Sequence, residues 1–88
     1  MENLNELKAK IHMHVNKLML DPSLPADAKK ELIKITKDLN SANNTEELNQ
    51  IGGRFHALSD SKLSLTRDQR GEIYSPSCWI GDYIYQKR

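Results

Sequence analysis

The chain has 88 residues, of which 38% are hydrophobic and 28% charged, and its formal net charge is +1. This balance is typical of a small globular domain, and it argues against a disordered chain and against a strong overall field that would attract nucleic acid or an anionic membrane. The single cysteine, Cys78, rules out an internal disulfide framework, the usual support of a small secreted scaffold. We therefore expect one domain in a reducing, intracellular compartment.

Two further features bear on membranes and export. No apolar run approaches the roughly 18 residues that a membrane-spanning helix needs. The first residues include Glu2 and Glu6, where a signal peptide would carry basic residues. Both features predict a cytoplasmic protein.

The first predicted helix runs from about residue 3 to 20. Apolar residues recur at spacings of three and four, which places them on one face of an α-helix. The residues of this face are Leu4, Leu7, Ile11, Val15 and Leu18. Pro22 should end the helix, because proline disfavours helical geometry in the residue before it.

The second predicted helix begins near Pro25, since proline is tolerated in a first helical turn, where its missing N–H would have had no partner. Its apolar face consists of Ala28, Leu32, Ile35 and Leu39. The polar run 40–44 should separate this helix from the next.

The third predicted helix begins at Asn44 or Thr45, because either side chain can accept a hydrogen bond from a free N–H group at a helix start. Its buried face consists of Leu48, Ile51, Phe55 and Leu58. Gly52 and Gly53 lie within this pattern at a cost of roughly 1 kcal/mol each relative to alanine. Such a pair indicates close approach of a neighbouring helix or a kink.

A fourth helix should follow the connector Leu63–Leu65. Thr66 and Gln69 fit a capping box, in which each side chain bonds to the other residue's main-chain N–H. Pro76 should end this helix, so we expect it to be short, with Ile73 as its main apolar anchor.

The last twelve residues, 77–88, differ in composition from the rest. Four of the five aromatic residues of the chain lie in its last fifteen positions, namely Tyr74, Trp79, Tyr83 and Tyr85. They could cover the open end of a small bundle, or they could form a recognition surface, since tryptophan and tyrosine are enriched at binding hot spots. Both roles can hold for different residues.

These elements predict an all-α fold. Three helices with one-sided apolar faces and short connections should pack antiparallel, and a short fourth helix should complete a four-helix bundle. We expect the bundle domain to span 1–76, and the aromatic C-terminal tail, 77–88, to pack on the bundle or extend from it.

The sequence offers no pattern for catalysis or for a cofactor. His12 and His14 point to different sides of a helix, so they cannot share a metal ion unaided, and one cysteine with scattered histidines, including His56, does not make a zinc site. Nothing near Cys78 indicates an activated thiolate. We therefore expect no enzyme activity, no metal and no cofactor.

An alternative reading is a small regulatory adaptor or a phage-type inhibitor that could bind DNA. The third helix, a turn and the fourth helix could form a helix-turn-helix with Lys62, Arg67 and Arg70 toward the groove. The connection 59–65 is longer than the usual three or four residues, and the net charge is close to neutral. We therefore do not expect nucleic acid as a partner.

The chain resembles the immunity proteins that protect producers of class IIa, pediocin-like bacteriocins. The resemblance lies in the run Leu-Pro-Ala-Asp-Ala-Lys-Lys-Glu-Leu at 24–32 and above all in Lys-Leu-Ser-Leu-Thr-Arg-Asp-Gln-Arg at 62–70. It also lies in the third predicted helix, which has acidic residues in its first turn and contains Leu48 and Phe55. It covers about residues 3–75. One departure is that the fourth helix is commonly longer in this family than Pro76 would allow here.

The resemblance implies a bacteriocin immunity function, a form of antimicrobial resistance, without enzyme activity. It implies a cytoplasmic protein, partly at the inner membrane face, that acts as a monomer or weak dimer and can associate peripherally with the membrane. The implied partner is the mannose phosphotransferase permease with bacteriocin bound, and specificity is attributed to the C-terminal half. The implied partner-binding residues are Lys62, Arg67, Arg70, Tyr74, Trp79, Tyr83 and Tyr85.

Overall fold

Four α-helices make up the computed structural model, which describes residues 2–86. They are α1 (Leu4–Met19), α2 (Ala26–Ser41), α3 (Thr45–Ser59) and α4 (Arg67–Gln86). No strand occurs within residues 2–86. The prediction of an all-α four-helix bundle is confirmed.

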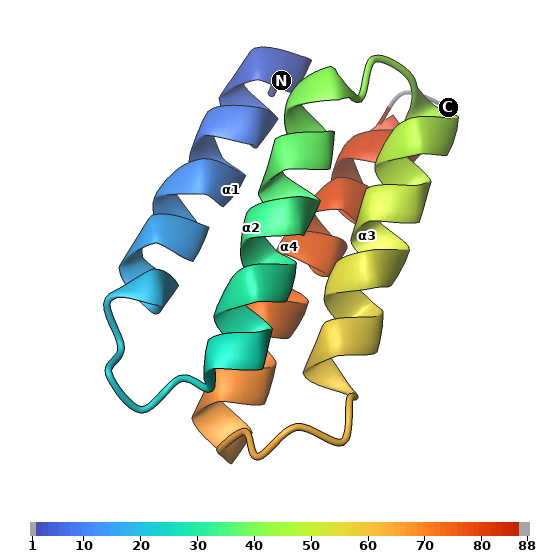
Figure 1. Cartoon of the computed structure of the whole chain (residues 1–88). Coiled ribbons are helices and arrows are strands. Elements are labelled where there is room, and N and C mark those ends of the chain that lie inside the picture. Colours follow the sequence, from blue (N-terminus) through green and yellow to red (C-terminus); the bar gives the residue numbers. More distant parts are fainter. Residues whose placement is uncertain (1, 87–88) are drawn as a thin grey trace.

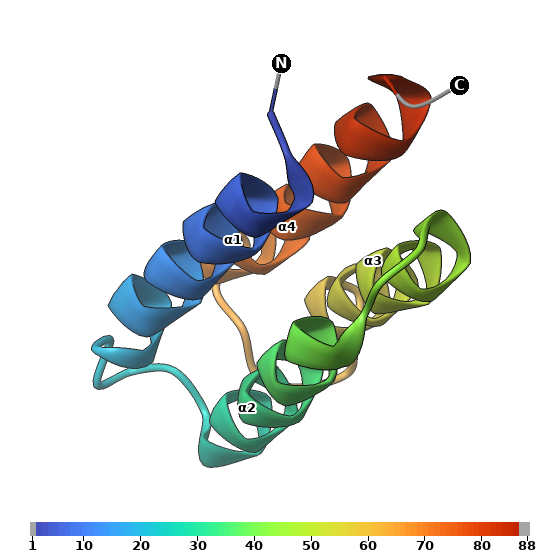
Figure 2. The same ribbon diagram turned by 90° about the horizontal axis from the view of Figure 1, so that it is seen from above.

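The helices run alternately up and down the bundle (Figure 1). Seen from above, α1 lies beside α2 and α4, and α3 completes the square between those two helices (Figure 2). The largest interface is the one between α3 and α4. The start of α1 and the end of α4 lie at the same end of the bundle.

Local capping explains where the helices begin. The side chain of Asn3 accepts a hydrogen bond of 2.9 Å from the N–H of Glu6, which completes a capping box at the start of α1. Asn44, one of the two predicted candidates, caps α3 and accepts a 2.9 Å bond from the N–H of Glu47. These caps satisfy N–H groups that have no partner inside the helix.

The buried faces of the first three helices agree with the predicted apolar patterns. Leu4 is half-buried at the edge of the core, and the other predicted residues of these faces are all buried. Phe55, the largest of them, is completely buried. From α4, the core receives Ile73, Pro76, Ile80 and Tyr83.

The glycine pair in α3 allows α4 to come close. Gly52 is buried, and a Cβ atom at this position would lie 3.4 Å from Cγ2 of Ile80. Gly53 is exposed, and a Cβ there would have no atom within 4 Å. The prediction of a close helix approach is confirmed for Gly52.

The prediction that Pro76 ends the fourth helix is wrong. α4 has 20 residues and continues through Pro76 to Gln86. The described part of the predicted tail is therefore helical, and it places Ile80 and Tyr83 in the core. Lys87 and Arg88 lie outside the described residues.

A side chain from α1 explains why α4 tolerates the proline. Pro76 has no N–H to donate to the carbonyl of Glu72, one helical turn earlier. Nε2 of His14 lies 2.6 Å from that carbonyl oxygen. Because a carbonyl only accepts, His14 must donate, and it replaces the missing hydrogen bond.

Candidate functional site

The seven residues predicted to bind a partner do not form one surface. Lys62 and Arg67 are exposed near the turn between α3 and α4, and Tyr74 and Tyr85 are exposed along α4. The other three are half-buried or buried, namely Arg70, Trp79 and Tyr83. The structure therefore divides the predicted site into exposed residues and residues that support the fold.

Arg70 holds the connection between α3 and α4. Its guanidinium donates to the carbonyl oxygens of Ser59 and Ser61, both at 2.9 Å, and to that of Leu63 at 3.0 Å. Three carbonyls of one turn thereby share one charged donor group. In this structure, the Arg70 side chain therefore stabilises the connector between α3 and α4.

Trp79 and Tyr83, two aromatic residues of the predicted C-terminal tail, pack against the bundle. Tyr83 is 7% exposed, and Trp79 packs against the edge of the core. The Trp79 ring meets the imidazole of His14 edge-on at 4.9 Å, and Nζ of Lys10 lies 4.6 Å from its centre. Such a cation–π contact adds to the α1–α4 interface. These aromatic residues therefore pack on the core as part of α4, and not as a tail that folds over the open end of the bundle.

An exposed stripe runs along the outer side of α4. Arg67, Tyr74, Cys78 and Tyr85 follow one another at spacings of seven, four and seven residues, which places them on one side of a helix. Tyr74 is 42% exposed and Tyr85 78%. We call these four residues the α4 stripe.

Two neighbours hold Tyr74 in place within the stripe. A hydrogen bond with Cys78 raises the pKa of the Tyr74 phenol above its ordinary value. The ring of His56, from α3, meets the Tyr74 ring edge-on at 5.2 Å. The sequence did not predict the contact between His56 and Tyr74. The apolar spacing of the third helix does place His56 outside its buried face.

A shallow pocket of about 320 Å³ lies beside the stripe, between α3 and α4. Glycines from both helices line part of it, so main chain is accessible there. The lining residues are Asn49, Gly52, Gly53, His56, Tyr74, Ser77, Cys78, Ile80 and Gly81. The glycine pair in the sequence was the signal that could have indicated this feature.

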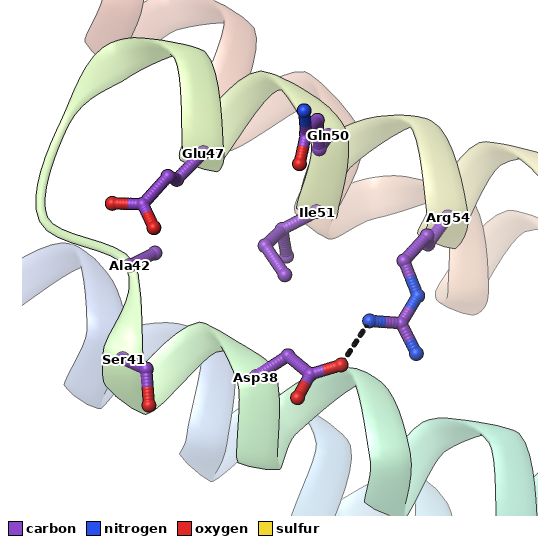
Figure 3. Close-up of a pocket in the computed structure, with 7 residues that line it drawn as sticks. All are labelled: Asp38, Ser41, Ala42, Glu47, Gln50, Ile51 and Arg54. Atoms are coloured by element: carbon purple, nitrogen blue, oxygen red, sulfur yellow. Dashed lines mark hydrogen bonds and ion pairs between the residues drawn. The ribbon is translucent and has the colours of Figure 1, made fainter.

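A second pocket, of about 280 Å³, opens between α2 and α3 (Figure 3). Arg54 of α3 forms an ion pair with Asp38 of α2, drawn as a dashed line, and lies 3.5 Å from Glu31. The hydrogen bond with Asp38 raises the pKa of the Arg54 guanidinium. Arg54 thus links α2 and α3, and its positive charge is paired with carboxylates of α2.

Two kinds of site are absent from the described residues, a metal-ligand cluster and a membrane-spanning helix. Residues 2–86 contain no group of three histidine, cysteine or acidic side chains that could hold a metal ion. None of the described helices combines the length and apolar character required to cross a membrane. The exposed aromatic and basic side chains of the α4 stripe are the groups most suited to contact another molecule.

No protein-family model matches the chain, and neither a curated protein nor a solved structure matches it.

Proposed function

We propose that the chain is a bacteriocin immunity protein of the pediocin-like class, which binds the bacteriocin-engaged mannose permease from the cytosolic side and catalyses no reaction. Two sequence stretches support this proposal, 24–32 and 62–70, in which the chain resembles that family. The antiparallel bundle agrees with the fold that the resemblance implies.

The length of α4 adds support. The sequence predicted a short fourth helix, which would have set the chain apart from the family. With 20 residues, α4 removes that departure. It also turns the C-terminal segment into a rigid helical surface, which loses little conformational entropy on binding.

The observation that carries the proposal is the α4 stripe. Tyr74 and Tyr85 are exposed although both are large and partly apolar. Tyrosine and arginine are enriched among residues that dominate binding energy, and Arg67 lies on the same side of the helix. The stripe lies in the C-terminal half, the part to which the resemblance attributes specificity.

The test is expression of the full chain in a bacteriocin-sensitive strain that is challenged with a panel of class IIa peptides. The wild-type chain should allow survival against at least one peptide. The double variant Tyr74→Ala/Tyr85→Ala should lose this protection with little change in melting temperature, because both side chains are exposed. A matched control, Asn16→Ala/Lys34→Ala, changes two exposed residues on other helices and should protect fully.

Two results would contradict the proposal at different levels. Full protection by the double tyrosine variant would show that the α4 stripe is not the contact surface. Uniform killing of cells that contain abundant, folded wild-type protein would contradict the immunity function itself. Deletion of residues 77–88 is not a suitable test, because it would remove Ile80 and Tyr83 from the core.

A further inference from the structure

Three of the four glycines lie in helices without a packing reason inside the fold. Gly53 in α3 and Gly71 and Gly81 in α4 are exposed, and a Cβ atom at each position would have no atom within 4 Å. None of them has a positive φ, so their backbone conformation does not require glycine either. Because glycine weakens a helix relative to alanine, these three residues lower the stability of the bundle without an internal contact that accounts for them.

Two of the three glycines open onto one pocket. Gly53 and Gly81 both line the pocket of about 320 Å³ between α3 and α4, whereas Gly71 does not. Two buried residues, Gly52 and Ile80, line it as well. The absence of side chains at positions 53 and 81 lets another molecule approach the main chains of both helices. We call this pocket the glycine groove.

The lining of the glycine groove favours an uncharged partner surface. Among the described residues, the nine that line it include no aspartate, glutamate, lysine or arginine, although these types make up 28% of the chain. On the α4 side, the Ser77 hydroxyl donates to the carbonyl of Tyr74 at 2.6 Å, and the Tyr74 phenol is hydrogen-bonded with Cys78. Burying a charge against such a lining costs free energy, because no counter-charge is available there.

The glycine groove is continuous with the α4 stripe. Tyr74 and Cys78 belong to both. The ring of His56, whose centre lies 5.2 Å from that of the Tyr74 ring, connects the stripe with the α3 side of the groove. A partner that contacts the exposed Tyr74 side chain therefore lies directly beside the groove.

We propose that the glycine groove receives an α-helix of the partner, which packs across α3 and α4 with an uncharged face. The inference rests on the proposed function, so this helix belongs to the permease complex with bacteriocin bound. Helix axes approach to about 8 Å only where the side chains at the contact are small, and glycines on both helices provide such a contact. An extended peptide fits less well, because strand pairing needs free main-chain N–H and C=O groups, and those inside a helix are already bonded.

Single alanine substitutions separate partner binding from folding. Gly53→Ala and Gly81→Ala should each raise the melting temperature by about 4 °C, because alanine favours the helix and its methyl group meets no atom of the chain. In a strain that the wild-type chain protects, each variant should allow killing at a roughly tenfold lower bacteriocin concentration, since the methyl group holds the partner helix away. A purely structural role of the two glycines predicts the opposite, because a more stable protein should protect at least as well.

Gly71→Ala is the matched control. It makes the same exchange at an exposed position of α4 outside the glycine groove, so it should give a similar gain in melting temperature. It should also protect as well as the wild-type chain. Sedimentation equilibrium of each purified protein should show the same association state for the wild-type chain and all three variants.

Three results would overturn the inference while the proposed function stands. The first is full protection by the double variant Gly53→Ala/Gly81→Ala. The second is an equal loss of protection in Gly71→Ala. The third is self-association of the wild-type chain that Gly53→Ala and Gly81→Ala abolish, which would assign the groove to a second copy of the chain. Uniform killing of cells that contain folded wild-type protein would instead contradict the proposed function and this inference together.

Discussion

The imidazole of His14 and the main chain at Glu72 form a hydrogen bond of 2.6 Å across the α1–α4 interface. It completes a helix that the proline at position 76 would otherwise interrupt. The same imidazole contacts Trp79, over which Lys10 is placed. One side chain of α1 therefore supports both the continuity of α4 and the packing of its second half.

We expect the energetic roles of His14 and Pro76 to be coupled. His14→Phe should destabilise the protein in the wild-type background, because the carbonyl of Glu72 then loses its donor. In a Pro76→Ala background, alanine supplies its own N–H to that carbonyl, so the same substitution should cost less. A double-mutant cycle of urea unfolding free energies should give a coupling of about 1 kcal/mol.

The carboxylate of Glu72 provides the control for this cycle. It lies 3.4 Å from Nε2 of His14 and is exposed. Glu72→Gln removes its charge and keeps the carbonyl, so it should have little effect on stability, as exposed ion pairs usually do. A coupling near zero in the cycle would mean that His14 acts through Trp79 or Glu72 and not through the helix backbone.

Arg70 should be important for stability. Arg70→Ala leaves three carbonyls of the connector without their charged donor, and it should lower the free energy of unfolding by about 2 kcal/mol. Arg67→Ala, an exposed neighbour, should change it by less than about 0.5 kcal/mol. Chemical denaturation of both variants measures the difference. Equal effects would show that the Arg70 hydrogen bonds contribute nothing beyond ordinary surface interactions.

The glycine pair of α3 should respond unequally to alanine. Gly53→Ala places a methyl group in open space within a helix, so it should stabilise the protein by up to about 1 kcal/mol. Gly52→Ala places the methyl 3.4 Å from Ile80, so it should gain less. Thermal unfolding of the two variants compares them directly. A larger gain at position 52 would contradict the close packing of α3 on α4.

Asp21 should make the stability depend on acidic pH. Its hydrogen bond from Gln69, and further bonds from Ser23, lower its pKa in the folded protein below the ordinary value of 3.8. A carboxyl with a lowered folded pKa stabilises the protein fully above its unfolded pKa and loses this contribution as the pH falls through the folded pKa. The stability difference between wild type and Asp21→Asn should therefore be constant near neutral pH and decrease below about pH 3.8. A difference that does not change with pH would show that Asp21 acts only as a hydrogen-bond acceptor.

Local patterns in the sequence were sufficient for most of the fold. The apolar spacing on the first three helices predicted their buried faces. A helix that packs on the core with one side and faces water with the other repeats its apolar residues with a period near 3.6. The capping box of Thr66 and Gln69 is formed as predicted, with bonds of 2.9 and 3.1 Å. Both signals depend only on residues close in sequence.

The errors concern features that depend on residues far apart in the chain. Pro76 is a helix terminator when it is judged by its neighbours, and its compensating donor lies on another helix. In the same way, Arg70 looked like an exposed binding residue, because nothing local reveals that three carbonyls converge on it. Of the seven residues predicted to bind a partner, the α4 stripe contains Arg67, Tyr74 and Tyr85, and Lys62 is exposed outside it.

The bond between His14 and the main chain of Glu72 also constrains how such a chain can evolve. Because the acceptor is a backbone atom, any side chain at position 72 that is compatible with the helix keeps the bond, whereas the effects of positions 14 and 76 depend on each other. Proline at 76 is well tolerated only after a donor is present at 14, so the order of the two substitutions matters. Among descendants of this sequence, a lineage that loses the histidine should be under selection to replace the proline as well.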